Sequence, residues 1–306
     1  MQEPSRSSTS GLPMALGAYT IWGLLPLYLM LVHQVPPFEF VGWRIVFTLP
    51  LCAAFIAARG QQAELAAAFR NRAVLLKLAA SALLIGVNWL IYIAAIQRGH
   101  IFAASLGYYI NPLANVVAGT LFLGERLNRR QWLAVAIAGL GVSLLAWDAR
   151  EMLWISLSLA ASFCAYGIVR KLTPVGAVPG LTVETVLLLL PALALVGWYA
   201  AQPAGSAFGR DAGSSLLIAF SGVVTAVPLA LFAMAARRMS YSALGFVQFI
   251  APTMVFITGL LVFREPLSQT KLACFVLIWI AIAVFCWDAV QRLRAAKVED
   301  ATKADA

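Results

Sequence analysis

Long apolar stretches separated by short polar segments dominate this chain, and each stretch is continuously apolar rather than alternating. A hydrocarbon core of about 30 Å takes roughly 20 apolar residues in a helix. Strands of a membrane barrel instead alternate in polarity over about ten residues. The pattern therefore predicts an all-α membrane protein with ten transmembrane helices, over residues 12–32, 37–58, 74–97, 101–122, 130–147, 151–169, 180–200, 214–236, 241–263 and 270–290.

The composition strengthens this prediction. Of the 306 residues, 62% are hydrophobic and only 11% are charged, whereas soluble domains carry about 25% charged residues. An ordinary soluble globule is therefore excluded. The first apolar stretch is followed by no Ala-x-Ala site, so we expect a retained helix rather than a cleaved signal peptide.

The positive charges are distributed unevenly along the chain. If the N-terminus is cytoplasmic and ten helices alternate, 16 of the 22 Lys and Arg residues fall in cytoplasmic segments and 5 on the other side, with Arg44 inside a helix. Cytoplasmic loops of membrane proteins carry such an excess. The net charge of +9 therefore indicates orientation in a membrane rather than a nucleic-acid partner. It predicts a cytoplasmic N-terminus (1–11) and a cytoplasmic tail (291–306), which we expect to be solvated and frayed.

The chain resembles itself at an offset of 140 residues. The stretch "LFLGERL" (121–127) aligns with "LVFREPL" (261–267), so that Glu125 falls on Glu265 and Pro112 on Pro252. We interpret residues 12–147 and 151–290 as two five-helix repeats, and an odd number of crossings inserts the second repeat upside down. Each glutamate is expected to lie in a polar turn just ahead of a helix, where a carboxylate favours the N-terminal dipole. Inverted repeats are typical of secondary transporters.

Several longer stretches carry a family resemblance. They are "FEFVGWRIVF", "NWLIYIAAIQRGHIFAASLGYYINPLANVVAGTLFLGERL", "YGIVRK", "LTVETVLLLLPALAL" and "GVVTAVPLALFAMAARRMSYSALGFVQFIAPT". With these, the chain resembles the EamA-domain transporters of the drug/metabolite transporter superfamily, most closely the RarD type. The resemblance implies ten helices in two inverted EamA repeats, a bacterial inner-membrane location, and efflux or exchange of small organic solutes. One position departs from the expected pattern, because Trp43 stands where RarD-type chains are expected to carry a histidine.

Polar and aromatic groups within the apolar stretches are the candidate substrate pathway. In hydrocarbon, polar side chains turn toward partners or toward a wet cavity. The prolines Pro112 and Pro252 are expected to kink helices at matching positions of the two halves. Plain interhelical hydrogen bonding and packing is the alternative for each residue. The candidates are Arg44, Asn88, Trp89, Tyr92, Tyr108, Asn111, Tyr166, Glu184, Gln248 and Trp22, the last as a cavity wall.

Arg44 and Glu184 coincide at the 140-residue offset, but their expected depths differ. Counted from the predicted helix starts, Arg44 lies about seven residues from the outer side, roughly 10 Å deep, and Glu184 about four residues from the inner side, roughly 6 Å deep. We therefore predict two separate sites rather than an ion pair, each of which needs water or another partner. Glu39 is a poor partner for Arg44 by its helical position. Snorkelling of Arg44 and a helix-dipole role for Glu184 are the alternatives.

The sequence offers little for catalysis. The four cysteines lack metal-site spacing, no histidine lies within an apolar stretch, and no GxxxxGK[ST] motif is present. We therefore expect no cofactor, no metal and no enzyme activity, and we favour a secondary transporter (a permease or exporter) over an intramembrane enzyme or a channel. An amino-acid exchanger rather than a drug exporter also remains open. The expected partners are a small-molecule substrate and the lipid bilayer, and a homodimer is left open.

Overall fold

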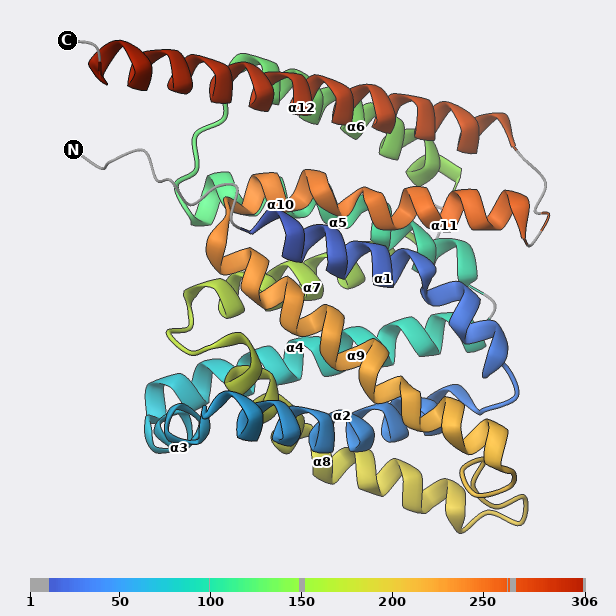
Figure 1. Ribbon diagram of the computed structural model, residues 1–306. Coiled ribbons are helices and arrows are strands. Elements are labelled where there is room, and N and C mark those ends of the chain that lie inside the picture. Colours follow the sequence, from blue (N-terminus) through green and yellow to red (C-terminus); the bar gives the residue numbers. More distant parts are fainter. Residues whose placement is uncertain (1–10, 99, 149–151, 263, 265–267, 305–306) are drawn as a thin grey trace.

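The computed structural model describes residues 11–98, 100–148, 152–262, 264 and 268–304, and its regular elements are helices (Figure 1). The expectation of an all-helical fold is confirmed. Glu265 and most of the predicted N-terminal segment lie outside the described residues. The helices are α1 (Leu12–Leu31), α2 (Pro37–Arg59), α3 (Gln62–Arg70), α4 (Arg72–Gln97), α5 (Ile101–Phe122), α6 (Arg129–Asp148), α7 (Leu153–Leu172), α8 (Ala177–Ala200), α9 (Ala212–Arg238), α10 (Tyr241–Gln248), α11 (Ile250–Leu261) and α12 (Gln269–Ala304).

Nine helical segments of the described chain are long and apolar enough to cross a membrane, with α10 and α11 counted together as one of them. Helix α5 has 22 residues and is not among the nine. Its length suffices for a crossing. The chain is therefore a multi-pass helical membrane protein, and the tenth crossing by α5 stays a prediction.

Capping side chains explain where several helices begin. At the start of α6, Gln131 N donates to Asn128 Oδ1 (2.9 Å) and Asn128 N donates to Gln131 Oε1 (3.0 Å), which forms a reciprocal capping box. The Asp211 carboxylate accepts a bond of 2.8 Å from Ser214 N at the start of α9. Each cap satisfies backbone N–H groups that the first helical turn leaves unpaired.

Four helix starts recur at the 140-residue offset. Helices α2 and α8 begin at 37 and 177, α4 and α9 at 72 and 212, α5 and α10 at 101 and 241, and α6 and α12 at 129 and 269. The packing has the same pairing, because α2 packs against α8 and α6 against α12. Helix α1 packs against α9 and α11, while α7 packs against α4 and α5. Helix α1 begins, and α12 ends, at the same end of the bundle (Figure 1).

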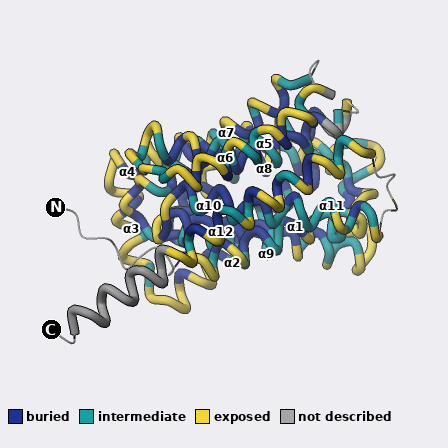
Figure 2. Tube along the Cα trace, turned by 90° about the horizontal axis from the view of Figure 1, so that it is seen from above, coloured by how far each residue is buried: buried dark blue, intermediate teal, exposed yellow. Residues whose placement is uncertain are grey.

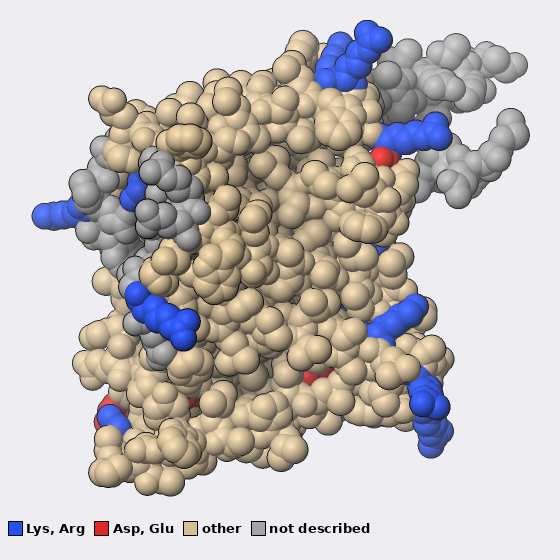
Figure 3. Space-filling view, turned by 180° about the vertical axis from the view of Figure 1, so that it is seen from behind, with Lys and Arg blue, Asp and Glu red and all other residues tan. Residues whose placement is uncertain are grey.

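The outer faces of the bundle suit a lipid environment. Buried positions line the inside of the bundle and exposed ones its outside (Figure 2). Large apolar side chains lie on that outside, among them Leu190 and Leu216, which are 78% and 72% exposed. Lys and Arg lie toward the two ends of the face in Figure 3, whose broad middle consists mostly of uncharged residues. A largely uncharged belt between two charged rims is typical of a membrane-spanning protein.

Two elements differ from the sequence-based expectation. Helix α3 was not predicted, and it is held by Leu65 and Ala68, which pack with Leu78 and Val183. The C-terminal tail was expected to fray, whereas α12 continues to Ala304. The segment after residue 290 contains neither Gly nor Pro and is rich in Ala, Arg and Lys, which favour continuation of a helix.

Candidate functional site

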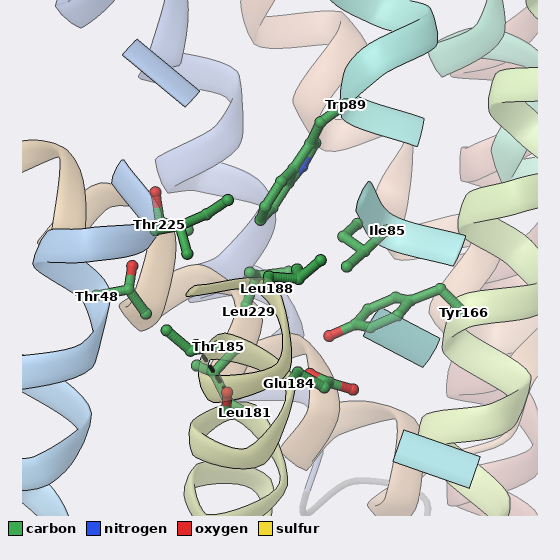
Figure 4. A pocket seen from close by; sticks show the side chains of 11 residues that line it. Thr48, Ile85, Trp89, Tyr166, Leu181, Glu184, Thr185, Leu188, Thr225 and Leu229 are labelled. Atoms are coloured by element: carbon green, nitrogen blue, oxygen red, sulfur yellow. Dashed lines mark hydrogen bonds between the residues drawn. The ribbon is translucent and has the colours of Figure 1, made fainter. Parts of the chain in front are cut away.

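A small cavity, here called the central cavity, lies in the middle of the bundle among α2, α4, α7, α8 and α9 (Figure 4). Its volume is about 10 Å³, which is room for a single water molecule. Ligand pockets for organic molecules are far larger, about 300–1,000 Å³, so the cavity is closed around its centre. The lining residues are Ile45, Thr48, Ile85, Trp89, Tyr166, Leu181, Glu184, Thr185, Leu188, Thr225 and Leu229.

One end of the central cavity carries a buried carboxylate, that of Glu184 on α8. Ser81 Oγ on α4 donates a short hydrogen bond to Glu184 Oε1, and Arg170 Nε on α7 lies 3.6 Å from the same oxygen. The Tyr166 hydroxyl points toward this carboxylate in Figure 4. The side chains of Arg170 and Glu184 are 1% and 2% exposed. An ion pair this deeply buried loses its hydration, so its neighbours have to replace the lost hydrogen bonds.

The sequence-based expectation was wrong about this ion pair in two respects. Arg170 was assigned to a cytoplasmic loop, but α7 extends to Leu172 and turns the arginine inward. Glu184 was expected about four residues into its helix, but α8 begins at Ala177, so Glu184 lies as deep as Arg44 does in α2. A Cβ atom on Gly180 would lie 2.0 Å from Arg170 Nη1. The glycine therefore leaves the space that the guanidinium occupies.

The other end of the central cavity leads to Arg44 on α2. Arg44 Nε donates to Thr225 Oγ1 at 2.9 Å, and the guanidinium carbon lies 4.7 Å from the centre of the Trp89 ring. Both Trp89 and Thr225 line the cavity, so Arg44 lies directly behind its wall. The rings of Tyr92 and Tyr108 meet edge to face nearby, with centroids 5.7 Å apart. Within the described residues, neither Arg44 nor Glu184 is the other's ion-pair partner.

A glycine brings Thr225 within reach of Arg44. A Cβ atom on Gly222 of α9 would lie 2.4 Å from the Phe47 carbonyl oxygen of α2, so the two backbones approach more closely than any other residue type would allow. Thr225 follows three residues later on the same face of α9. Its hydroxyl donates to Ser221 O at 2.7 Å, which leaves its oxygen free to accept from Arg44.

Two of the candidate residues lie in a separate amide cluster. Asn115 Nδ2 on α5 donates to Gln248 Oε1 on α10 at 2.6 Å, and Asn111 lies buried one turn before Asn115. Helix α10 ends at Gln248, four residues before Pro252, which lacks the N–H that would bond to the Gln248 carbonyl. Helix α5 instead continues through Pro112. The amide cluster is thus associated with a helix break in one half only.

Two further candidates lie away from the central cavity. Asn88 Nδ2 donates to Leu159 O and Ser162 Oγ, both at 2.9 Å, and so joins α4 to α7. Trp22 was expected as a cavity wall, but it lies among aromatic rings, with centroids 5.6 Å from Phe163 and 5.9 Å from Phe232. Neither Asn88 nor Trp22 is among the residues that line the central cavity.

Glu125 differs in role from the sequence-based expectation. It lies in the turn before α6, yet its carboxylate accepts hydrogen bonds from Tyr241 N (2.5 Å), Ser242 N (2.8 Å) and Ser242 Oγ (2.7 Å) at the start of α10. The Glu125 carboxylate therefore stabilises the N-terminal dipole of α10, a helix that begins 116 residues later in the chain. The turn before α6 thus connects the two predicted halves of the chain.

The chain resembles known transporters over nearly its whole length. An uncharacterized transporter of Pseudomonas aeruginosa is 43% identical over 93% of this chain and 95% of that protein. Protein RarD of Salmonella typhi is 40% identical over 95% of this chain and 99% of that protein. A protein of known crystal structure shares the fold, with a TM-score of 0.70 and 20% identity over 92% of this chain and 98% of that one.

These relatives confirm two predictions, the family resemblance and the expectation of a transporter rather than an enzyme. Residues 9–147 also match the EamA-like transporter family. Together with the apolar helices, this similarity assigns the protein: the chain belongs to the EamA-like transporter family and is a multi-pass membrane protein with RarD-named relatives.

Proposed function

We propose that this chain is a secondary transporter that moves small organic metabolites or drugs across the bacterial inner membrane by alternating access. The observation that carries the proposal is the central cavity, which lies deep in the membrane-spanning bundle beside the buried Glu184 carboxylate and is closed to about 10 Å³. An organic solute fits there only if the surrounding helices move apart. Closed midplane sites between helices are typical of transporters that expose the site to one side at a time.

The arrangement of the helices supports two inverted five-helix repeats. Four pairs of helices begin 140 residues apart, and the main contacts between helices recur after the halves are exchanged. The contact of α1 with α9 corresponds to that of α7 with α4, and the contact of α1 with α11 to that of α7 with α5. In addition, α6 and α12 begin at opposite ends of the bundle (Figure 1). We therefore assign residues 12–147 to the first repeat and 151–290 to the second, with α5 as the tenth crossing.

The charge distribution supports an orientation with both termini in the cytoplasm. Arg170 lies buried and no longer counts toward the cytoplasmic charges, but 15 of 22 Lys and Arg residues remain on that side against 5 on the other. Such a bias sets the orientation of helical membrane proteins. In this orientation, Glu184 belongs to the cytoplasmic half of the pathway and Arg44 to the outer half.

A channel is the second candidate, and the closed cavity favours a transporter over it. A channel would need a continuous path lined by carbonyls or rings of charge. The two functions differ in kinetics, because a carrier saturates and exchanges solute across the membrane in counterflow, whereas flux through a channel does neither.

The test is counterflow in proteoliposomes that contain the full-length protein, with a panel of labelled organic solutes. Thr185→Leu places a bulkier side chain in the cavity wall and should abolish counterflow. Its matched control is Ser143→Leu, because Ser143 is exposed on α6 and its hydroxyl, like that of Thr185, bonds to the carbonyl four residues earlier. Flux that rises linearly with concentration, or counterflow equal in both variants, would overturn the proposal.

A further inference from the structure

The surroundings of Arg44 are aromatic and neutral. Its Nε bonds to the Thr225 hydroxyl, and its guanidinium lies over the Trp89 ring. The phenol groups of Tyr28, Tyr92 and Tyr108 are the other groups that interact with it electrostatically. Arg44 is half-buried, and the Tyr108 side chain beside it is 46% exposed. We call this group of residues the Arg44 site.

No acidic side chain among the described residues balances the charge of Arg44. Glu39, one turn earlier on α2, is directed to another partner: it accepts from Ser206 Oγ (2.5 Å) and Ala207 N (2.8 Å) in the α8–α9 loop. Glu184 is paired with Arg170, so those two charges cancel. Arg44 therefore has no ion-pair partner among the described residues.

A charge inside a membrane protein is costly unless a partner or water compensates it. A guanidinium is permanently charged, and its planar fork matches an anionic group such as a carboxylate or a sulfonate. Neutral hydroxyl and aromatic partners orient Arg44 without neutralising it. The missing negative charge is what a ligand would supply.

We infer that the transported solute is an organic monoanion with an aromatic or otherwise apolar body, whose anionic group binds Arg44. The rings of Trp89, Tyr92 and Tyr108 provide the surface for the apolar body, since aromatic side chains bury large areas in defined orientations. A cation would be repelled, and a neutral analogue would leave the guanidinium uncompensated. This inference rests on the proposed transport function and adds the substrate class.

The test compares three ligands of similar shape and different charge. Benzenesulfonate is an anion, benzenesulfonamide is neutral and benzyltrimethylammonium is a cation at neutral pH. Binding to the full-length protein in detergent is measured by the shift in melting temperature and by quenching of tryptophan fluorescence. We expect benzenesulfonate to stabilise the protein, and the neutral and cationic analogues to have no effect.

Variants then assign the binding to Arg44. Arg44→Gln should weaken benzenesulfonate binding about tenfold to a hundredfold, as expected for the loss of charge-assisted hydrogen bonds. Arg44→Lys keeps the positive charge but loses the planar guanidinium that can form two parallel hydrogen bonds. Its affinity for benzenesulfonate should therefore lie between those of the wild type and Arg44→Gln. Arg98→Gln is the matched control, because it removes an exposed positive charge beyond the end of α4 and should bind like the wild type.

Equal binding of all three ligands, or unchanged binding by Arg44→Gln, would overturn the inference. A protein that shows counterflow of neutral or cationic solutes, and none of anions, would retain the proposed transport function and lose only the substrate class. Absence of counterflow for every solute, together with Arg44-dependent binding of benzenesulfonate, would refute transport and leave an anion-binding site.

Discussion

Two charged side chains of the pathway, those of Glu184 and Arg44, are compensated in different ways. Glu184 has a cationic partner in Arg170 at 3.6 Å, while Arg44 has the neutral hydroxyl of Thr225 at 2.9 Å. The ion pair is not saturated, since Arg170 Nη1 has no hydrogen-bond partner among the described residues. A buried pair of this kind adds little net stability, yet the removal of one partner leaves a buried charge alone.

Glu184→Gln should therefore destabilise the protein strongly. It leaves the Arg170 guanidinium buried without a carboxylate, and the free energy of unfolding should fall by about 3–5 kcal/mol. The double variant Arg170→Met/Glu184→Leu removes both charges and should recover most of this loss. Unfolding in detergent, followed by circular dichroism, measures both. A single variant as stable as the wild type would show that Arg170 and Glu184 do not stabilise each other.

At the scale of the helices, close backbone contact places the polar groups. Gly222 allows α9 to lie against the Phe47 carbonyl of α2, and this contact brings Thr225 to Arg44. Gly180 has the same role for α8 and the Arg170 side chain. Both positions hold glycine for steric reasons at a contact between two helices.

Gly222→Ala should separate α9 from α2 and lengthen the Arg44–Thr225 hydrogen bond. The added methyl group would lie 2.4 Å from a backbone oxygen, and overpacking of this kind costs about 1–3 kcal/mol. Gly139→Ala on α6 is the control, because nothing lies within 4 Å of the added atom. The control should be neutral or stabilising by up to about 1 kcal/mol, from the higher helix propensity of Ala. Thermal unfolding of the two variants compares these outcomes.

The long apolar helices could be predicted from the sequence, whereas the short helix α3 and the contacts between helices could not. The length of an apolar stretch and a capping residue such as Asp211 are local signals in the sequence, so the order of the long helices could be predicted. The partner of Glu184 could not be predicted. The predicted end of α7 was three residues too early, which placed Arg170 in a loop instead of the core. Trp22 was misplaced for a related reason, since a helix position does not determine which neighbouring helix a side chain meets.

At the scale of the whole molecule, a glutamate of the first half binds the second half at each end of the bundle. Glu125 binds the start of α10 at the end where α1 begins. Glu39 binds Ser206 and Ala207 between α8 and α9 at the opposite end. Separation of the halves at either end requires release of the corresponding carboxylate.

Glu125→Gln and Glu39→Gln should therefore favour opening at opposite ends. A single cysteine, Thr185→Cys in a background without Cys52, Cys164, Cys274 and Cys286, reports access to the central cavity. Each glutamine variant should raise its labelling rate about tenfold or more from one side only, because a neutral amide replaces charge-assisted hydrogen bonds. Membrane-impermeant thiol reagents applied to vesicles of known orientation measure the rate. Equal rates from both sides in both variants would contradict these assignments.

The orientation itself is tested by two surface cysteines in the same background. Arg126→Cys in the turn before α6 should be labelled from the cytoplasm, and Ser268→Cys before α12 from outside. Arg126 is preferable to Asn128, whose amide donates to both carboxylate oxygens of Asp288. Labelling of both cysteines from the same side would exclude the inverted repeat.

The unbalanced charge of Arg44 also has an electrical consequence. A membrane potential acts on every charge that moves through it, with about 2.3 kcal/mol per elementary charge per 100 mV for a full crossing. With a monoanion bound, the Arg44 site carries no net charge, so the potential exerts little force on its reorientation. The empty site keeps its positive charge and feels the potential when it returns. Voltage should therefore act on the return of the empty carrier rather than on the loaded step.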